Sequence, residues 1–407
     1  MPIAGSLPRS SVFQGALCAA VLLALCGHAG ATDYTYRALN KPLGATACHV
    51  PSMGVREPGQ SWMSDAGEVL GECEFLVGYM KWPDPATGKT VSVPQYRVWP
   101  TVWSAGGSPR VLSLPSGYGL SLLRGMDASG RVVGAVSSTT HVGDGYWVSW
   151  QGGQRSDFVL PASLVAKGGS LANWGVAHMG HAGGFLLVNP ADGQVATWQG
   201  TSVQVYDAPR IPDCVGLTNL GGFLSDAGRV VMGTSCNDPW TAQGGTYQLA
   251  NGQWQPMSPP LDANQSPYSV MTLGARGETV YRASDLSTVV VDAAGRATPL
   301  ANSALPAGRY FPTLRVGYLD MNVQGVVVGA GWFPGEPELA NDIYSFRATA
   351  WIQGKATNLN TATLNLPKGI VLNDAINVNA KGQIFVQGWG STTGGAAREQ
   401  LGVLTPR

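Results

Sequence analysis

Charged side chains are scarce in this sequence of 407 residues. Lys, Arg, Asp and Glu make up 12% of the chain, and the 25 basic residues balance the 25 acidic ones. That share is about half of what soluble proteins usually carry. A formal net charge of zero provides no long-range attraction to a polyanion, which argues against nucleic acid or an anionic membrane surface as a partner.

The chain also lacks an apolar run of the roughly 20 residues that a membrane-spanning helix requires. Its apolar segment Ala16–Leu25 has ten residues. Arg9 precedes this segment and Ala29-Gly30-Ala31 follows it, an order typical of a secretory signal with an A-x-A cleavage site. We therefore predict a signal peptide over residues 1–31 and a single mature domain over 32–407, located in the periplasm or secreted.

An alternative places a lipid anchor on Cys26. Leu25, directly before it, is larger than the residue that such sites usually contain. Neither interpretation includes a transmembrane span.

A repeated unit dominates the rest of the chain, and its clearest copy is Gly125–Leu160. An apolar run leads into the turn Asp127-Ala128-Ser129-Gly130, which is followed by the β-branched stretch Arg131–Val136. Asp can bond to the backbone ahead of it, and Gly tolerates a positive φ, so this is a hairpin signal. Tyr146–Trp150 and Ser156–Leu160 are typical of two further strands joined by a second tight turn.

The unit recurs about every fifty residues. We place its turn glycines at Gly67, Gly130, Gly180, Gly228, Gly277, Gly325 and Gly382. The copies at Gly180 and Gly277 match the pattern least well. Seven units of four short strands predict an all-β fold, a β-propeller of seven four-stranded blades.

The last unit lacks a fourth strand, because the chain stops at Arg407 soon after Leu401–Thr405. A segment near the other end, Asp33–Asn40, alternates like a strand but precedes the first full unit. We expect Tyr34–Leu39 to fill the empty place, which would close the ring and remove an exposed sheet edge.

The repeats resemble those of the bacterial extracellular HAF-repeat family. Its members carry an Asn/Asp-x-x-Gly-x-Val-Val-Gly strand and a later Ala-x-x-Trp-x-x-Gly strand. The best matches here are Leu220–Gly233 and Ala348–Gly354, and the third and fifth copies depart from the pattern. The resemblance covers most of the mature chain and implies a propeller, with no catalytic residue to carry over; we expect no cofactor.

Four cysteines remain after removal of the signal: Cys48, Cys73, Cys214 and Cys236. An even number in an oxidising compartment predicts two disulfides, with three connectivities to choose from. One pair flanks the first hairpin of the first unit, and the other flanks that of the fourth. We therefore predict Cys48–Cys73 and Cys214–Cys236.

The two sides of the predicted ring differ in their connections. Both tight turns of each unit belong to one side, the tight-turn face. The other side, the long-loop face, takes the long connections, such as Phe75–Tyr96, Ser137–Gly145 and Trp332–Ser345. Loops on a rigid scaffold commonly carry function, so we expect a binding site on this face or at the mouth of the central channel.

Aromatic residues in the long loops are the candidate ligand contacts: Trp82, Trp240, Trp332, Phe333 and Trp389. They would stack on sugar rings or anchor a protein partner; alternatively, they cap the core. Four other tryptophans occupy the repeated strand position and are expected in the core between blades: Trp103, Trp150, Trp198 and Trp351.

Evidence for catalysis or metal binding is weak. His178 and His181 have no third His or Cys nearby in the sequence, so we predict no metal site. A glycosidase or lyase would need paired carboxylates, for which the long loops offer Asp207, Asp213, Asp238, Asp262, Glu336, Glu338 and Asp342.

The sequence therefore favours an exported, non-catalytic and monomeric propeller. It would bind a protein or glycan of the cell envelope through the long-loop face. The alternative is a carbohydrate-active enzyme that uses carboxylates on that face, and a third hypothesis is a structural envelope protein.

Overall fold

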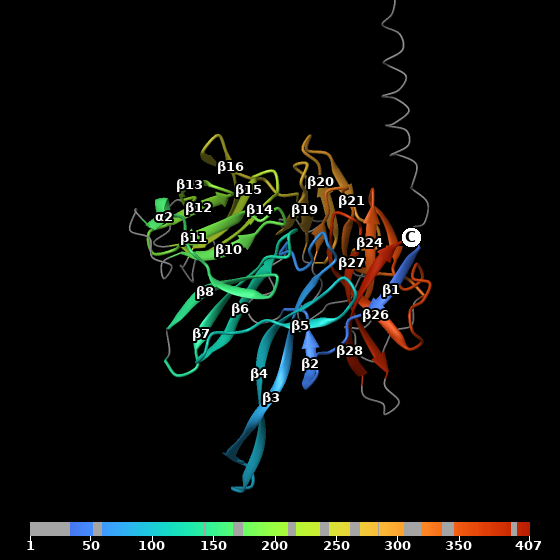
Figure 1. Ribbon diagram of the computed structural model, residues 1–407. Helices are drawn as coiled ribbons and strands as arrows, with labels where there is room; N and C mark the ends of the chain where they lie inside the picture. The colour runs from blue at the N-terminus through green and yellow to red at the C-terminus, as the bar shows by residue number, and fades with distance from the viewer. Residues whose placement is uncertain are drawn as a thin grey trace, which may run out of the picture.

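Seven four-stranded antiparallel sheets surround a central channel in the computed structural model of the protein (Figure 1). The structure describes residues 33–51, 59–141, 144–165, 174–210, 217–236, 244–260, 269–283, 285–304, 319–335, 346–391 and 397–407. The predicted seven-bladed propeller is confirmed.

The first four blades follow the chain, each beginning with the strand at the channel. Blade one contains β2 (Ala45–His49), β3 (Val69–Pro83), β4 (Thr90–Trp103) and β5 (Pro109–Val111). Blade two contains β6 (Tyr118–Met126), β7 (Val132–Ser138), β8 (Gly145–Gln151) and β9 (Gln154–Asp157). Blade three contains β10 (Gly175–Met179), β11 (Phe185–Asn189), β12 (Gln194–Gln199) and β13 (Ser202–Asp207), and the helical turn α2 (Ala162–Val165) precedes it. Blade four contains β14 (Leu217–Leu224), β15 (Val230–Cys236), β16 (Gly244–Ala250) and β17 (Gln253–Pro256).

The last three blades complete the ring. Blade five contains β18 (Ser269–Leu273), β19 (Thr279–Arg282), β20 (Thr288–Val291) and β21 (Ala297–Pro299). Blade six contains β22 (Asp320–Met321), β23 (Val327–Trp332), β24 (Phe346–Ile352) and β25 (Lys355–Asn358). Blade seven contains β26 (Ile370–Val378), β27 (Ile384–Ser391), β28 (Ala397–Pro406) and, as its outermost strand, β1 (Tyr34–Ala38).

The N-terminal strand closes the ring, as predicted. β1 pairs antiparallel with β28 from Tyr34↔Pro406 to Ala38↔Gly402. Asn365, on the connection between blades six and seven, fixes β1 from its other edge: its Oδ1 accepts from the Tyr36 N–H at 2.6 Å and its Nδ2 donates to the Tyr36 carbonyl at 2.9 Å. Burial raises the pKa of Tyr36 to about 12.

A polar contact spans the junction between blades seven and one. His49 Nδ1 lies 2.6 Å from Glu399 Oε2, and Glu399 Oε1 accepts a hydrogen bond from Gln387 Nε2 at 2.8 Å. The hydrogen bond to Glu399 raises the pKa of His49, with a smaller contribution from Glu74. The two ends of the ring are thus joined by side chains as well as by strand pairing.

The first hairpin of every blade turns in the same way. The first residue of the turn donates its N–H to the carbonyl of the fifth, and the glycine at position four donates to the carbonyl of the first. Those glycines have φ values from 74° to 94°, which non-glycine residues rarely adopt. In blade three this glycine is Gly183 rather than Gly180, so our assignment was wrong there: Gly180 occupies the first position of the turn.

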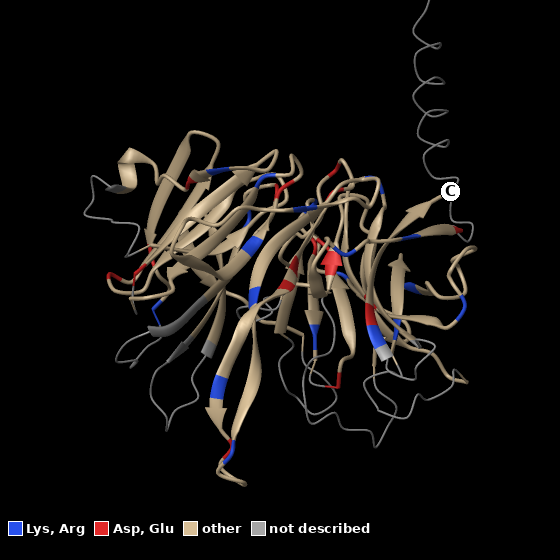
Figure 2. Cartoon of the chain, turned by 60° about the horizontal axis from the view of Figure 1, so that its bottom comes forward, with Lys and Arg blue, Asp and Glu red and all other residues tan. Residues whose placement is uncertain are grey.

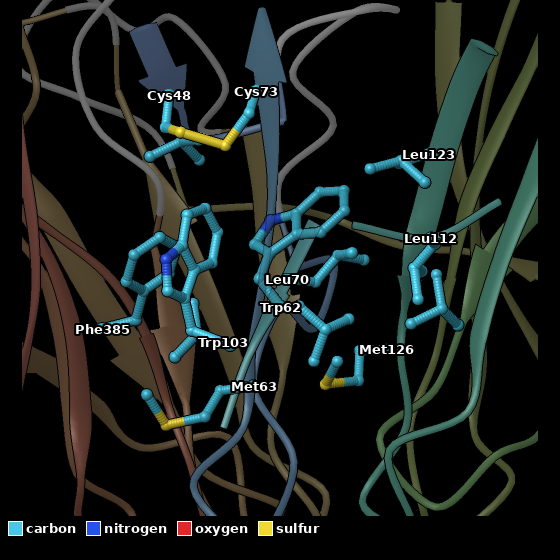
Figure 3. Packing of buried hydrophobic residues seen from close by; sticks show 14 of the residues in the cluster. Cys48, Trp62, Met63, Leu70, Cys73, Trp103, Leu112, Leu123, Met126 and Phe385 are labelled. Carbon is cyan, nitrogen blue, oxygen red and sulfur yellow. A yellow bond between two sulfur atoms is a disulfide. The ribbon is translucent and has the colours of Figure 1, made fainter. Parts of the chain in front are cut away.

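Tryptophans at the repeated position fill the spaces between blades. Trp103, Trp150 and Trp351 are fully buried, and Figure 3 shows Trp103 packed near Phe385 of β27. Each donates its indole N–H to a carbonyl on the connection that leads into its own blade, at 2.6–2.9 Å, the acceptors being Asn40, Ser113 and Ala301. Their prediction as core residues is confirmed.

Trp198 was expected in the same role but is only half-buried. The reason lies on the neighbouring strand: Trp103, Trp150 and Trp351 each face a valine, whereas Trp198 faces Phe185. Phe185 fills the core position of blade three, and Trp198 packs on its outer side with ring centroids 5.1 Å apart.

The predicted disulfide Cys48–Cys73 is present. The two cysteines are directly opposite each other in β2 and β3, with Cα atoms 4.0 Å apart, and the bond borders the core of blade one (Figure 3). The second predicted pair falls partly outside the described residues, because Cys214 is not among them.

Replacing both Cys48 and Cys73 by Ser should lower the free energy of unfolding by about 3 kcal/mol, because the bond closes a loop of 25 residues in the unfolded chain. Urea denaturation under oxidising conditions measures the loss. As the matched control, the double variant and the wild type are compared again under a reducing agent, where their free energies of unfolding should agree. An unchanged midpoint under oxidising conditions would contradict the assignment.

Candidate functional site

A two-stranded arm projects from the long-loop side of the ring (Figure 1). We predicted Phe75–Tyr96 to be a long irregular connection, and that prediction was wrong. β3 and β4 continue beyond the blade and stay paired from Leu76↔Tyr96 to Pro83↔Thr90. We call residues 76–96 the arm.

The tip of the arm is closed by Asp84. Its carboxylate accepts from the Ala86 N–H at 2.9 Å and from the Thr87 hydroxyl at 2.7 Å, while its own N–H donates to the Lys89 carbonyl at 2.9 Å. These hydrogen bonds to Thr87 and Ala86 lower the pKa of the Asp84 carboxyl. Residues 84–89 therefore form the turn of this hairpin.

Exposed apolar side chains are concentrated on the arm. Thirteen large hydrophobic residues are exposed among those that the structure describes, and eight of them belong to these two strands. The eight are Leu76, Val77, Tyr79, Met80, Trp82, Val91, Val93 and Tyr96. Their exposed fractions run from 39% to 65%, so the arm is covered neither by itself nor by the ring.

Strand register divides these side chains between the two faces of the arm. Met80 lies opposite Val93 and Trp82 opposite Val91, which puts these four on one face. Leu76 and Tyr96 are paired on the other face, where Tyr79 is paired with Pro94. Charge is sparse here, and most of the arm is tan in Figure 2.

Both backbone edges of the arm lack a neighbouring strand in the described part of the protein. β2 pairs with β3 only as far as Phe75, and β5 pairs with β4 only from Thr101. The arm therefore offers unpaired N–H and C=O groups in addition to its side chains.

The other predicted aromatic contacts are placed differently from Trp82. Trp332 ends β23, is half-buried, and packs edge-on against Phe346 with ring centroids 6.0 Å apart. Phe333, directly after it, is also half-buried, as is Trp389 within β27. Three of the predicted loop residues thus belong to strands, because the strands extend further than the turn signals indicated: Trp82, Trp332 and Trp389. Trp240 lies outside the described residues.

Few of the acids considered for catalysis can be placed. Asp207 ends β13 and is exposed, and its backbone carbonyl accepts the indole N–H of Trp254 at 2.6 Å. The other six acids lie outside the described residues: Asp213, Asp238, Asp262, Glu336, Glu338 and Asp342.

A cavity that is partly open to solvent occupies the central channel. Its lining includes the residue at the second position of the first turn in five successive blades, which are His181, Asp226, Ala275, Val323 and Ala380. The cavity is therefore at the tight-turn end of the channel, away from the arm.

Asp320 and Asp226 are the carboxylates of this cavity. Asp320 Oδ2 accepts from Asn377 Nδ2 at 2.5 Å and from the Val378 N–H at 2.9 Å. Burial raises the pKa of Asp320 to about 6; the Val378 N–H opposes the rise, and the Asp226 carboxylate adds to it. Asp226 Oδ1 accepts from the Ala182 N–H at 2.7 Å.

The two histidines of the motif at 178–181 join blades together. The carbonyl of Gly59 lies 2.9 Å from His178 Nε2, and the N–H of Leu224 donates to His178 Nδ1 at 3.3 Å. Burial lowers the pKa of His178 to about 4, so this ring is neutral near pH 7. His181 bridges Ser61 Oγ at 3.2 Å and Asp65 Oδ1 at 3.1 Å.

Two negative findings concern only the described ranges. No group of three or more His, Cys, Asp or Glu side chains there is arranged to hold a metal ion. Within the same ranges, no helix has the length and apolar character needed to cross a membrane.

Sequence reasoning missed Asp226, Asp320 and Asn377 as cavity residues. A signal for Asp226 was present: it has the same place in Ser225–Gly228 as Asp65 has in Ser64–Gly67. A position repeated in every turn must ring the channel in a closed propeller. Asp320 and Asn377 lie on strands β22 and β26, where the repeat pattern gives no such indication.

Comparison with known proteins finds no match among protein-family models and none among curated proteins. Similar solved structures include the WD40 repeats of RRP9, with a TM-score of 0.41 and 11% identity over 92% of this chain and 98% of that one. The Dos1 propeller has a TM-score of 0.38 and 10% identity, over 92% and 94% of the two chains. Dipeptidyl peptidase 4 of Porphyromonas gingivalis has a TM-score of 0.35 and 12% identity; the alignment covers 67% of this chain and 41% of that one. The chain thus spans about two fifths of that protein's length, and the fold assignment rests on its own strand order.

Asp320→Asn should make the stability of the protein less dependent on pH. The folded-state pKa lies above the ordinary 3.8, so wild-type stability falls as pH rises from about 4 through 6. The amide does not titrate, and the variant should gain roughly 3 kcal/mol relative to the wild type across this interval. Urea unfolding at several pH values measures the gain.

Asp292→Asn is the matched control. Hydrogen bonds from Arg296 lower the pKa of Asp292, so this substitution should act in the opposite direction. A stability difference between Asp320→Asn and wild type that does not change from pH 4 to 7 would contradict a raised Asp320 pKa.

Proposed function

We propose that this protein is an exported, non-catalytic binding scaffold that engages a partner protein through the arm on its long-loop face. The observation that carries the proposal is the set of eight exposed apolar side chains on residues 76–96. Contiguous apolar surface of this kind is unfavourable in water and usually marks an interaction site.

The chemistry of the arm favours a protein over a glycan. Sugars are held by aromatic platforms together with dense polar contacts, whereas Trp82 shares its face of the arm with the apolar, non-aromatic side chains of Met80, Val91 and Val93. Trp82 and Tyr79 are the residue types that most often anchor protein interfaces. The unpaired edges add a second mode of contact, since an extended segment of a partner can continue the sheet.

Export and family membership belong to the same proposal. The Cys48–Cys73 bond is compatible with an oxidising compartment, where such bonds persist. The proposed place among the HAF-repeat proteins rests on the repeat motif in the sequence, an Asn or Asp turn that ends in Gly and leads into a Val-rich strand. Of the five predicted aromatic contacts, we assign Trp82 to the partner; Trp332 has a packing role within its own blade.

The arm can be tested by site-specific photo-crosslinking in the cells that produce the protein. A photoreactive residue in place of Tyr79, whose side chain is 65% exposed, should capture a defined partner protein. The control carries the photoreactive residue in place of Leu364, which is 57% exposed on the connection between blades six and seven, and it should capture no partner.

Binding to the purified partner then gives the decisive comparison. Trp82→Ser combined with Val91→Ser removes one exposed cross-strand pair and should weaken binding at least thirtyfold, about 2 kcal/mol. The unfolding midpoint should stay within a degree or two, because the arm contributes nothing to the ring core. Unchanged affinity in this variant, or equal capture from both crosslinking positions, would contradict the assignment.

A further inference from the structure

The channel cavity at the tight-turn face has an acidic lining. Asp226 and Asp320 are among its lining residues, and no Lys or Arg is. His178 is neutral near pH 7, since burial lowers its pKa to about 4. Near neutral pH the lining thus carries carboxylate charge that no lining Lys or Arg offsets.

One carboxylate oxygen in the cavity has no hydrogen-bond partner in the described part of the chain. Asp226 accepts the Ala182 N–H through Oδ1, which orients the group, and Oδ2 makes no hydrogen bond there. Asp320 is oriented by Asn377 and Val378. Both acids are half-buried and lie at the cavity rather than in the core.

Apolar groups make up the remaining wall. Phe223 is half-buried beside His178, with ring centroids 5.8 Å apart, and Met321 and Leu273 are buried next to the cavity. An aromatic face in a partly desolvated site attracts a cation, and the aliphatic groups accommodate a short hydrocarbon body.

The rim of the cavity is fixed by bonds between neighbouring turns. The N–H of Ala380 donates to Asp65 Oδ1 at 3.1 Å, that of Asp65 to the Ala128 carbonyl at 3.1 Å, and that of Ala128 to the His181 carbonyl at 2.7 Å. These bonds link blades seven, one, two and three, so the site needs little reorganisation on binding.

From this combination we infer that the cavity binds a small organic cation, a primary ammonium group carried on a short apolar body. The ammonium donates hydrogen bonds to Asp226 and Asp320, and the apolar body lies against Phe223 and Met321. Anions find no lining cation to pair with. The site is at the other end of the ring from the arm and does not depend on the arm's role.

Isothermal titration calorimetry of the full mature chain tests this with three probes of one shape. Phenethylamine is the cation, 2-phenylethanol its neutral analogue and phenylacetate an anion. We expect phenethylamine to bind at least tenfold more tightly than 2-phenylethanol at pH 7.5, and phenylacetate not to bind. Equal binding of amine and alcohol, binding of phenylacetate, or no amine binding at 10 mM would overturn the inference.

Variants locate the site. Asp226→Asn and Asp320→Asn should each weaken phenethylamine binding at least tenfold, while Asp292→Asn, an acid on a turn outside the cavity, should leave it unchanged. Asp226→Asn decides the outcome if Asp320→Asn does not fold. Equal binding by Asp226→Asn and wild type would overturn the inference, as would Ca²⁺ binding at the site without amine binding.

Discussion

The pairing of β1 with β28 is the contact on which the rest of the structure depends. Without it, blade seven has three strands and β28 presents an open edge. The same segment carries Asn40, whose carbonyl accepts the indole N–H of Trp103 in blade one. The His49–Glu399 contact and the Cys48–Cys73 bond lie close to this junction. Ring closure therefore joins the most distant parts of the chain and fixes the blade that carries the arm.

A closed ring gives its two faces different properties. On one face, seven turns have the same geometry. The second residue of the turn lines a shared cavity in five of the blades, so a substitution at this position changes the cavity wall. On the other face, connections vary freely in length, and in blade one this freedom produces a hairpin that extends far from the ring (Figure 1). The two proposed sites differ in character: one is a fixed, acidic cavity for a small cation, and the other is an arm rich in exposed apolar side chains for a protein surface.

The repeat pattern predicted the blades, the closing strand and the disulfide, because each follows from where identical units must meet. The repeat pattern gave wrong predictions where one unit differs from the other six. Gly180 was mistaken for the turn glycine because two glycine-containing registers fit the sequence, and only backbone geometry selects Gly183. Trp198 was predicted to be a core residue because its own strand matches the repeat. The residue that fills the core position instead, Phe185, lies on the neighbouring strand, so the pattern around Trp198 did not reveal it. The arm was missed because its strands have apolar residues on both faces, which hides the alternation of a half-buried sheet.

Amide hydrogen exchange on β28 tests the closed ring most directly. In a chain that begins at Thr32 and retains β1, the amides of β28 that bond to β1 should exchange only through global unfolding, like those of the other blades. A variant that lacks residues 33–39 should lose this protection at β28, with a lower unfolding midpoint, while β10 to β13 keep theirs under native conditions. If β28 stays equally protected and the midpoint does not change, then β1 does not close the ring, and the stability of the propeller does not depend on that pairing.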